Sequence, residues 1–255
     1  MDQHVVITGA SSGIGAALAR EFLGHGARTT LVARRRARLA QVAADWSSQA
    51  HLVACDLGDR DANLKWVAPA TRKFGPIDVL VNNAGMQVIG DMATLDPRQG
   101  ERALDLNLAY PLRLIQRVLP VMLERGRGHI VNVASIAAFA PTPHMCFYNA
   151  SKAGLAAASE SLRGELLKTQ VKVTTVYPGI VPDTEMGRRG LEMYEGGRLV
   201  DLQPTVTAEA LAKAVHRAVV RGQARVIFPR VNGLLRHLPN ATRFLLDRLT
   251  PPLRQ

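Results

Sequence analysis

Three side chains between residues 135 and 152 carry groups that can exchange protons with an alcohol or a carbonyl oxygen. They are the hydroxyl of Ser135, the phenol of Tyr148 and the ammonium of Lys152. Tyr148 and Lys152 are four residues apart, so on a helix they lie on the same face. A neighbouring ammonium favours the phenolate, and we therefore expect the pKa of Tyr148 to fall from about 10 towards neutrality, as proton transfer requires. The alternative is an ordinary Tyr and Lys on a surface helix, because Y-x-x-x-K is a short pattern.

A glycine-rich stretch near the N-terminus predicts a binding site for a dinucleotide. The run His4–Thr8 is apolar and β-branched, as in a buried parallel strand, and a helix-forming segment follows the glycines. Gly9 would permit a tight turn, Gly13 would let the backbone approach a pyrophosphate, and Gly15 would let the helix pack on the strand. The N-terminus of that helix would offer unpaired N–H groups to the phosphates. A glycine-rich turn without a ligand is the alternative.

The residues that follow the second expected strand favour NADP(H) over NAD(H). Arg28–Ala33 reads as this strand, and Arg34, Arg35 and Arg36 come next without an acidic residue. An acid at this place would bind the ribose 2′-hydroxyl of NAD, whereas a guanidinium can pair with the 2′-phosphate of NADP. The alternative is that these arginines only open the next helix in solvent.

Alternating strands and helices predict one doubly wound α/β domain over residues 1–255, with a mostly parallel seven-stranded sheet covered by helices on both faces. The expected strands are His4–Thr8, Arg28–Ala33, His51–Cys55, Ile77–Val81, His129–Val133, Val171–Val176 and Arg225–Phe228. The expected helices are Ala16–Leu23, Arg38–Trp46, a helix from an N-cap at Asp59 to Phe74, one from Pro97 past Asn107, Tyr110–Glu124, Phe147–Lys168 and Thr207–Arg221. Residues 180–205 have no clear periodicity and are expected to form a substrate-binding loop.

Three polar side chains, those of Asn83, Asn107 and Ser135, lie at places in this predicted fold where a functional role is expected. Asn83 and Ser135 follow strands at their carboxyl ends, which is the ligand side of such a sheet. Asn107 lies inside an expected helix, where asparagine lowers helix propensity, so its amide is expected to have a task. A buried cap-like hydrogen bond is the alternative for Asn107.

The composition excludes several other classes of protein. The chain has 255 residues, 47% of them hydrophobic, and a formal net charge of +11. Its arginines are scattered and form no basic stripe interleaved with aromatic residues, so we expect no nucleic-acid partner. Its two cysteines indicate free thiols in a reducing compartment and no metal site. The N-terminus lacks a secretory signal pattern and no apolar run could span a membrane, which favours a cytoplasmic protein.

Residues 231–255 form an apolar and basic tail. Its leucines fall on one side of a helix and alternate with arginines: Leu234, Leu235, Leu238, Leu245 and Leu249, with Arg236, Arg243 and Arg248. Such a segment can lie on a membrane surface, although Pro239 interrupts it. Packing on a second subunit or against the substrate pocket is the favoured alternative.

Several of these motifs, in this order and at these separations, resemble the short-chain dehydrogenase/reductase family in its compact single-domain branch. The resemblance covers about residues 3–230. It rests on Thr8–Gly15 (TGASSGIG), Asp56, Asn82–Gly85 (NNAG), Asn107, Ser135, Tyr148-x-x-x-Lys152 and Pro178-Gly179.

The resemblance implies an oxidoreductase that interconverts a secondary alcohol and a ketone or aldehyde by hydride transfer. Tyr148 would be the general acid/base, Ser135 would polarise the substrate oxygen, Lys152 would bind the nicotinamide ribose and Asn107 would position a water in a proton relay. Asp56 would meet the adenine, Asn83 the adenosine ribose, and the loop after Gly179 the carboxamide. The residues expected at the cofactor are Gly9, Ser11, Ser12, Gly13, Ile14, Gly15, Arg34, Arg35, Asp56, Leu57, Asn83, Ala84, Gly85, Tyr148, Lys152, Pro178, Gly179, Val181 and Thr184.

Three further expectations accompany this resemblance. Copies of the chain would pair through the helices near residues 97–124 and 147–168 into a homodimer or homotetramer. The segment after Gly179 is one residue longer than the x-V-x-T that the family often has, which puts the contact of Thr184 with the carboxamide in question. The alternative functions are a catalytically idle dinucleotide sensor or scaffold, and a peripheral membrane enzyme that acts on lipid-like substrates.

Overall fold

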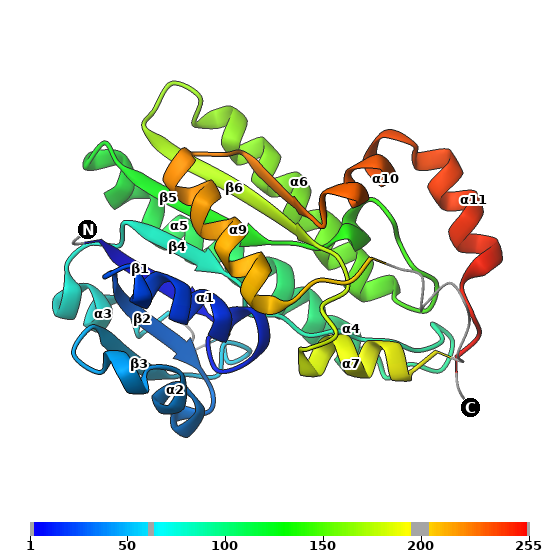
Figure 1. The fold of residues 1–255 in the computed structure, drawn as a ribbon, viewed down its shortest axis with the longest axis horizontal. Coiled ribbons are helices and arrows are strands. Elements are labelled where there is room, and N and C mark those ends of the chain that lie inside the picture. The colour runs from blue at the N-terminus through cyan, green and yellow to red at the C-terminus, as the bar shows by residue number, and fades with distance from the viewer. Residues whose placement is uncertain (1–2, 61–63, 195–203, 254–255) are drawn as a thin grey trace.

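The fold is a seven-stranded parallel sheet with helices on both faces, as the computed structural model shows (Figure 1). The structure describes residues 3–60, 64–194 and 204–253. The strands are β1 (His4–Thr8), β2 (Arg28–Ala33), β3 (Ala50–Ala54), β4 (Val79–Asn82), β5 (Gly128–Val133), β6 (Val171–Pro178) and β7 (Arg225–Phe228). Their order is β3-β2-β1-β4-β5-β6-β7, with every neighbouring pair parallel. The predicted doubly wound α/β fold is confirmed.

Two apolar cores lie on the two faces of the sheet, because buried parallel strands present apolar side chains to both sides. One core joins the sheet to α1 (Gly13–Gly24), α2 (Arg36–Val42) and α9 (Ala208–Arg221). The other joins it to α3 (Val67–Phe74) and α5 (Tyr110–Glu124). Figure 1 shows α1 and α9 side by side on the near face and α5 and α6 (Cys146–Glu165) behind the sheet.

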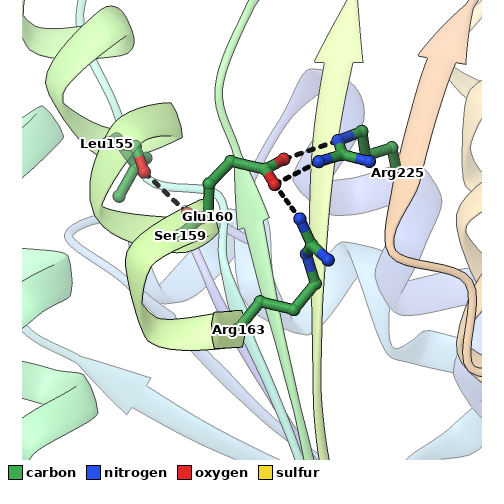
Figure 2. Close-up of polar contacts among 5 residues, drawn as sticks. All are labelled: Leu155, Ser159, Glu160, Arg163 and Arg225. Carbon is green, nitrogen blue, oxygen red and sulfur yellow. Dashed lines mark hydrogen bonds and ion pairs between the residues drawn. The ribbon is translucent and has the colours of Figure 1, made fainter. Parts of the chain in front are cut away.

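The edge strand β7 is fastened to α6 by a charged cluster. Glu160 of α6 accepts hydrogen bonds from Arg225 of β7 and from Arg163, as Figure 2 shows. Burial raises the pKa of the Glu160 carboxyl, but the two guanidinium groups outweigh burial and hold that pKa below its usual value. Nearby, the Ser159 hydroxyl donates to the Leu155 carbonyl at 2.6 Å. The end of the sheet that follows β6 is therefore anchored to the helix that carries Tyr148.

Several helix predictions need correction. The helix expected over Arg38–Trp46 is α2 (Arg36–Val42), and the one expected over Phe147–Lys168 is α6 (Cys146–Glu165). The helix expected from an N-cap at Asp59 begins only at Val67, with Trp66 at its N-cap, and residues 61–63 lie outside the described part of the chain. The Asp56 carboxylate accepts from Gly58 N at 3.0 Å, and such a local turn competes with helix formation. The helix from Pro97 is α4 (Pro97–Leu104), and it passes into a π-helical stretch, Asp105–Ala109, before α5.

The segment after β6 is more regular than expected. It contains α7 (Glu185–Glu192), which Thr184 caps by accepting from Gly187 N at 3.0 Å. The part of this segment over residues 195–203 lies outside the described residues.

The tail forms two helices, α10 (Gly233–His237) and α11 (Pro239–Leu249), because proline is tolerated at the first turn of a helix. The predicted leucine face falls mostly outside the described side chains, since only Leu235 and Leu238 of its five leucines are described. Leu238 and Phe244 are exposed. Among the described residues, no helix is long and apolar enough to cross a membrane.

Candidate active site

The glycine turn joins β1 to α1 and leaves backbone donors free for an anion. Gly9 and Gly13 have φ values of 69° and 53°, which side chains disfavour. A Cβ on Gly15 would lie 2.2 Å from the Gly9 carbonyl oxygen, so only glycine permits this packing. Ser12 precedes α1 in an extended conformation and its side chain makes no capping hydrogen bond. The first-turn N–H groups of α1 can therefore receive phosphate oxygens.

Thr8 and Asn83 hold this turn against β4. The Thr8 hydroxyl accepts from the N–H groups of Asn83 and Ala84 at 3.0 and 3.1 Å. The amide nitrogen of Asn83 donates to the Thr8 carbonyl at 2.9 Å. The side chain of Asn83, predicted near the adenosine ribose, is therefore bound to the chain that forms the turn.

A guanidinium lies at the mouth of the glycine turn. Arg35 occupies the N-cap position of α2, and its Nη2 donates to the hydroxyl of Ser12 at 3.2 Å and of Ser11 at 3.5 Å. Arg36 instead donates to the Leu52 carbonyl at 3.3 Å, and Arg34 is exposed. The structure thus brings Arg35 to the turn and keeps it close to the first residues of α1.

The segment after β3 places Asp56 at the same edge of the sheet. Asp56 Oδ2 lies 3.7 Å from Arg102 Nη2, and its Oδ1 accepts from Gly58 N. Leu57 is buried in the core that contains α5. A half-exposed carboxylate is thus available at the end of the sheet where an adenine was predicted.

The three proton-transfer residues form one buried cluster at the carboxyl end of β5. Ser135 follows β5, and Tyr148 and Lys152 lie on consecutive turns of α6. The Ser135 hydroxyl lies close enough to the Tyr148 phenol to lower its pKa. Lys152 Nζ donates to the Val133 carbonyl at 2.8 Å and lies 6.0 Å from the centroid of the Tyr148 ring. Tyr148 and Lys152, four residues apart in the sequence, therefore lie close together in the structure, as the spacing predicted.

The pKa of Tyr148 departs from its ordinary value in the direction opposite to the prediction. Burial raises the pKa of the phenol, and the neighbouring Ser135 hydroxyl only partly offsets this. Burial also lowers the pKa of Lys152 to about 8, because the ammonium loses its hydration. The predicted lowering of the Tyr148 pKa is wrong, since desolvation dominates and Lys152 Nζ donates to the Val133 carbonyl.

Asn107 is fully buried in the π-helical stretch between α4 and α5. Its amide oxygen accepts from Met86 N at 2.8 Å, and its amide nitrogen donates to the Met86 carbonyl at 2.8 Å and to the Ser151 hydroxyl at 3.0 Å. A Cβ on Gly85 would come within 3.1 Å of this amide oxygen and 3.4 Å of Lys152 Nζ. The hydrogen bonds between the Asn107 amide and the Met86 backbone confirm the alternative of a buried cap-like contact. They also fix the chain at Gly85 and Met86, beside Lys152.

The segment after β6 returns to the glycine turn. Gly179 N donates to the Phe228 carbonyl at 2.8 Å, and Pro178 closes β6. The Thr184 hydroxyl donates to the carbonyl of buried Val181 at 2.7 Å, and the Thr184 methyl group lies 3.1 Å from a Cβ built on Gly13. Thr184 therefore sits against the turn where a pyrophosphate would bind.

Sequence reasoning missed three residues that shape this site. Asp183, in the lengthened segment, accepts from Ala208 N at 2.9 Å and so binds the first N–H of α9, whose N-cap is Thr207. The Ser151 hydroxyl donates to the Tyr148 carbonyl at 2.8 Å while it accepts from Asn107. Tyr194 donates to the Pro143 carbonyl at 2.8 Å. Ser151 stands next to Lys152 and could have been suspected, whereas Tyr194 lies in a stretch without periodicity.

Fold and site together define a dinucleotide-binding α/β protein with a buried Ser-Tyr-Lys cluster at the carboxyl end of its sheet. Residues 3–195 match the short chain dehydrogenase family. An uncharacterized oxidoreductase of Staphylococcus epidermidis is 37% identical over 185 residues, which cover 72% of this chain and 80% of that protein. The chain belongs to the short-chain dehydrogenase/reductase family.

Two solved structures show which cofactors similar proteins carry. A short-chain dehydrogenase from Sphingobium yanoikuyae in complex with NADPH is 32% identical, with a TM-score of 0.80 over 97% of this chain and 96% of that one. A 3-ketoacyl-(acyl-carrier-protein) reductase from Brucella melitensis complexed with NADH is 25% identical, with a TM-score of 0.78 over 89% and 96%. The protein is an oxidoreductase of this family that uses a nicotinamide dinucleotide.

Proposed function

We propose that this protein is an NADP(H)-dependent oxidoreductase that interconverts a secondary alcohol and a ketone or aldehyde. The observation that carries the proposal is the buried cluster of Ser135, Tyr148 and Lys152, in which Ser135 lies close enough to the Tyr148 phenol to lower its pKa. Two hydroxyls that converge in a water-poor site can both bind the oxygen of one carbonyl group.

The donors around the glycine turn fit a dinucleotide. The free first-turn N–H groups of α1 would hold the pyrophosphate, and Arg35 beside Ser12 would meet a 2′-phosphate. Asp56 and Thr184 would take the adenine and carboxamide ends. When bound, the nicotinamide supplies or accepts the hydride.

Tyr148 would be the general acid in reduction and the general base in oxidation. A raised pKa keeps its phenol protonated at neutral pH, which suits proton donation to a carbonyl oxygen that gains negative charge. Ser135 would polarise that oxygen, and Lys152 would bind ribose hydroxyls and favour the phenolate when the reaction runs towards oxidation. Asn107, whose amide is held by the backbone of Met86, would position a water in a proton relay.

The substitution Tyr148→Phe tests this assignment because it keeps the ring and removes the proton. We expect kcat with a carbonyl substrate to fall by about 10²- to 10⁴-fold, the usual contribution of general acid–base catalysis. The affinity for NADPH, followed by fluorescence titration, is expected to change by no more than about twofold. Although the phenol borders the cofactor, the substitution removes only its hydroxyl. Reduction by Tyr148→Phe at near the unmodified rate would show that another group transfers the proton.

The preference for NADP(H) rests on Arg35 and the exposed Arg34. Charge-assisted hydrogen bonds contribute about 1.5 to 3 kcal/mol, so Arg35→Ala should weaken NADPH binding by about 10- to 150-fold and leave NADH binding almost unchanged. Arg36→Ala is the matched control, because its guanidinium donates to Leu52. Equal affinities of the unmodified protein for NADPH and NADH would exclude this preference.

The substrate is best sought among carbonyl compounds that include 3-ketoacyl thioesters, since one structurally similar protein is a 3-ketoacyl-(acyl-carrier-protein) reductase. A panel of ketones and aldehydes, followed by NADPH absorbance, would rank them. Residues 180–205 would shape the pocket within a single domain of residues 1–255. The homodimer or homotetramer through α4, α5 and α6 stays a prediction, and sedimentation velocity measures it.

A further inference from the structure

A second group of ligating side chains lies far from the candidate active site, between α1 and α9. Glu21 and His25 belong to the end of α1, and His216 belongs to α9. Their candidate ligand atoms all lie within 4.8 Å of one another. Glu21 stands eight residues beyond Gly13, so the cluster is about 12 Å or more along α1 from the glycine turn. It is therefore separate from the machinery that handles the dinucleotide and substrate.

We propose that Glu21, His25 and His216 form a binding site for a divalent transition-metal ion of the zinc type, which joins α1 to α9. Two imidazoles and one carboxylate are a donor set that Zn²⁺ accepts, with water at the fourth position. Calcium and magnesium prefer all-oxygen sites, so the two histidines select against them.

The two distances from Glu21 need only a small adjustment to reach those of a metal site, and the third pair of donor atoms lies within 4.8 Å. Glu21 Oε1 lies 3.8 Å from His25 Nδ1 and 3.9 Å from His216 Nδ1. Metal–ligand bonds of 2.0–2.1 Å in a tetrahedron place the donor atoms about 3.3 Å apart. An inward movement of about half an ångström at these two pairs is within the reach of ordinary side-chain rotation.

The two imidazoles differ in how firmly they are held. The rings stack with centroids 3.9 Å apart and an interplanar angle of 28°, so one ring must tilt for their lone pairs to converge on one ion. His216 is fixed by an edge contact with the ring of Phe22. His25 follows the end of α1 with its side chain 56% exposed, so it is the ring that can move.

The surroundings differ for the two histidines. His216 packs between the rings of Phe22 and His25, with its side chain 16% exposed. His25 Nδ1 lies 2.8 Å from the Glu21 carbonyl oxygen, so the mobile His25 ring must turn away from this carbonyl for Nδ1 to bind a metal. A cavity of about 260 Å³, lined by Glu21, His25, Lys213 and Glu209, leaves room for water ligands.

Zinc titration of the untagged, full-length protein by calorimetry tests the site. We expect binding of one ion per chain and a rise in Tm on addition of zinc. His25→Ala should weaken zinc binding by at least about tenfold and abolish the rise in Tm, and His216→Ala should do the same. Because His25 is exposed, its variant is expected to fold normally, which circular dichroism checks.

The matched control is His237→Ala, which removes an exposed histidine of α10 and should bind zinc like the unmodified protein. The proposal is overturned if the unmodified protein binds no zinc up to millimolar concentration, or if His25→Ala binds it as tightly as the unmodified protein. An equal loss of binding in His237→Ala would likewise assign the zinc to other residues.

Discussion

Lys152 is a buried ammonium whose burial should make the cofactor-free protein less stable. Its side chain is 5% exposed, and desolvation lowers its pKa from 10.5 to about 8. A difference of 2.5 pKa units corresponds to about 3 kcal/mol at 1.36 kcal/mol per unit. The Lys152→Met variant removes the charge at similar volume and loses a hydrogen bond to Val133 of about 1 kcal/mol. We therefore expect the free energy of unfolding of Lys152→Met at pH 7 to exceed that of the unmodified protein by about 2 kcal/mol. The variant should also lose activity.

The pH dependence of this difference has a definite sign. Below pH 8, Lys152 carries its proton in both the folded and the unfolded state, so the destabilisation is complete. Between pH 8 and 10.5 the unfolded state binds more protons than the folded state, and the stability of the unmodified protein rises with pH relative to the variant. Above pH 10.5 the destabilisation has gone.

Urea unfolding of both proteins at pH 7 to 11 measures this difference, because the titration of all other groups cancels when the two curves are subtracted. Lys168→Met, at an exposed lysine, is the control and should show a flat difference. A pH-independent difference between the unmodified protein and Lys152→Met, or a variant that is less stable at pH 7, would refute the reasoning.

Two further substitutions test the packing around the site. Gly15→Ala should destabilise the protein by at least about 1–3 kcal/mol and abolish dinucleotide binding, because its Cβ would meet the Gly9 carbonyl oxygen. Gly24→Ala is the control, because its Cβ has open space and the substitution should be neutral or slightly stabilising. Thermal unfolding measures both variants. Tyr194→Phe should cost about 1–3 kcal/mol, since it leaves the Pro143 carbonyl without this donor, and should raise KM more than it lowers kcat; unchanged stability would contradict that contact.

The sheet could be predicted from sequence because its strands are buried on both faces. Runs such as His4–Thr8 and Arg28–Ala33 are apolar and β-branched, and both are strands with these bounds. Helix starts were harder to predict, since local hydrogen bonds compete with the helix. The carboxylate of Asp56 closes a turn at Gly58, and the helix expected from Asp59 begins only at Val67.

Some features of the candidate site likewise follow from local sequence, whereas others depend on contacts between distant segments. That Tyr148 and Lys152 share a helix face follows from their spacing alone, and the glycine turn follows from three glycines between a strand and a helix. The direction of the Tyr148 pKa depends instead on how deeply the phenol is buried, which only the packing of distant segments determines. The two hydrogen bonds of Asn107 to Met86 join residues 21 apart, and no periodicity indicates them.

The turn over residues 141–143, between Ser135 and Tyr148, shows how such long-range contacts can define a substrate site. Its three carbonyl groups accept hydrogen bonds from three elements: Arg243 of α11 at 3.1 Å, Asn149 of α6 at 2.7 Å and Tyr194 after α7 at 2.8 Å. The C-terminal helix and the segment after β6 therefore hold the same turn that leads to Tyr148. Arg243 thus fastens α11 to the turn of its own chain that leads to Tyr148. Substitutions in α11 should accordingly change substrate affinity before they change the chemistry at Tyr148.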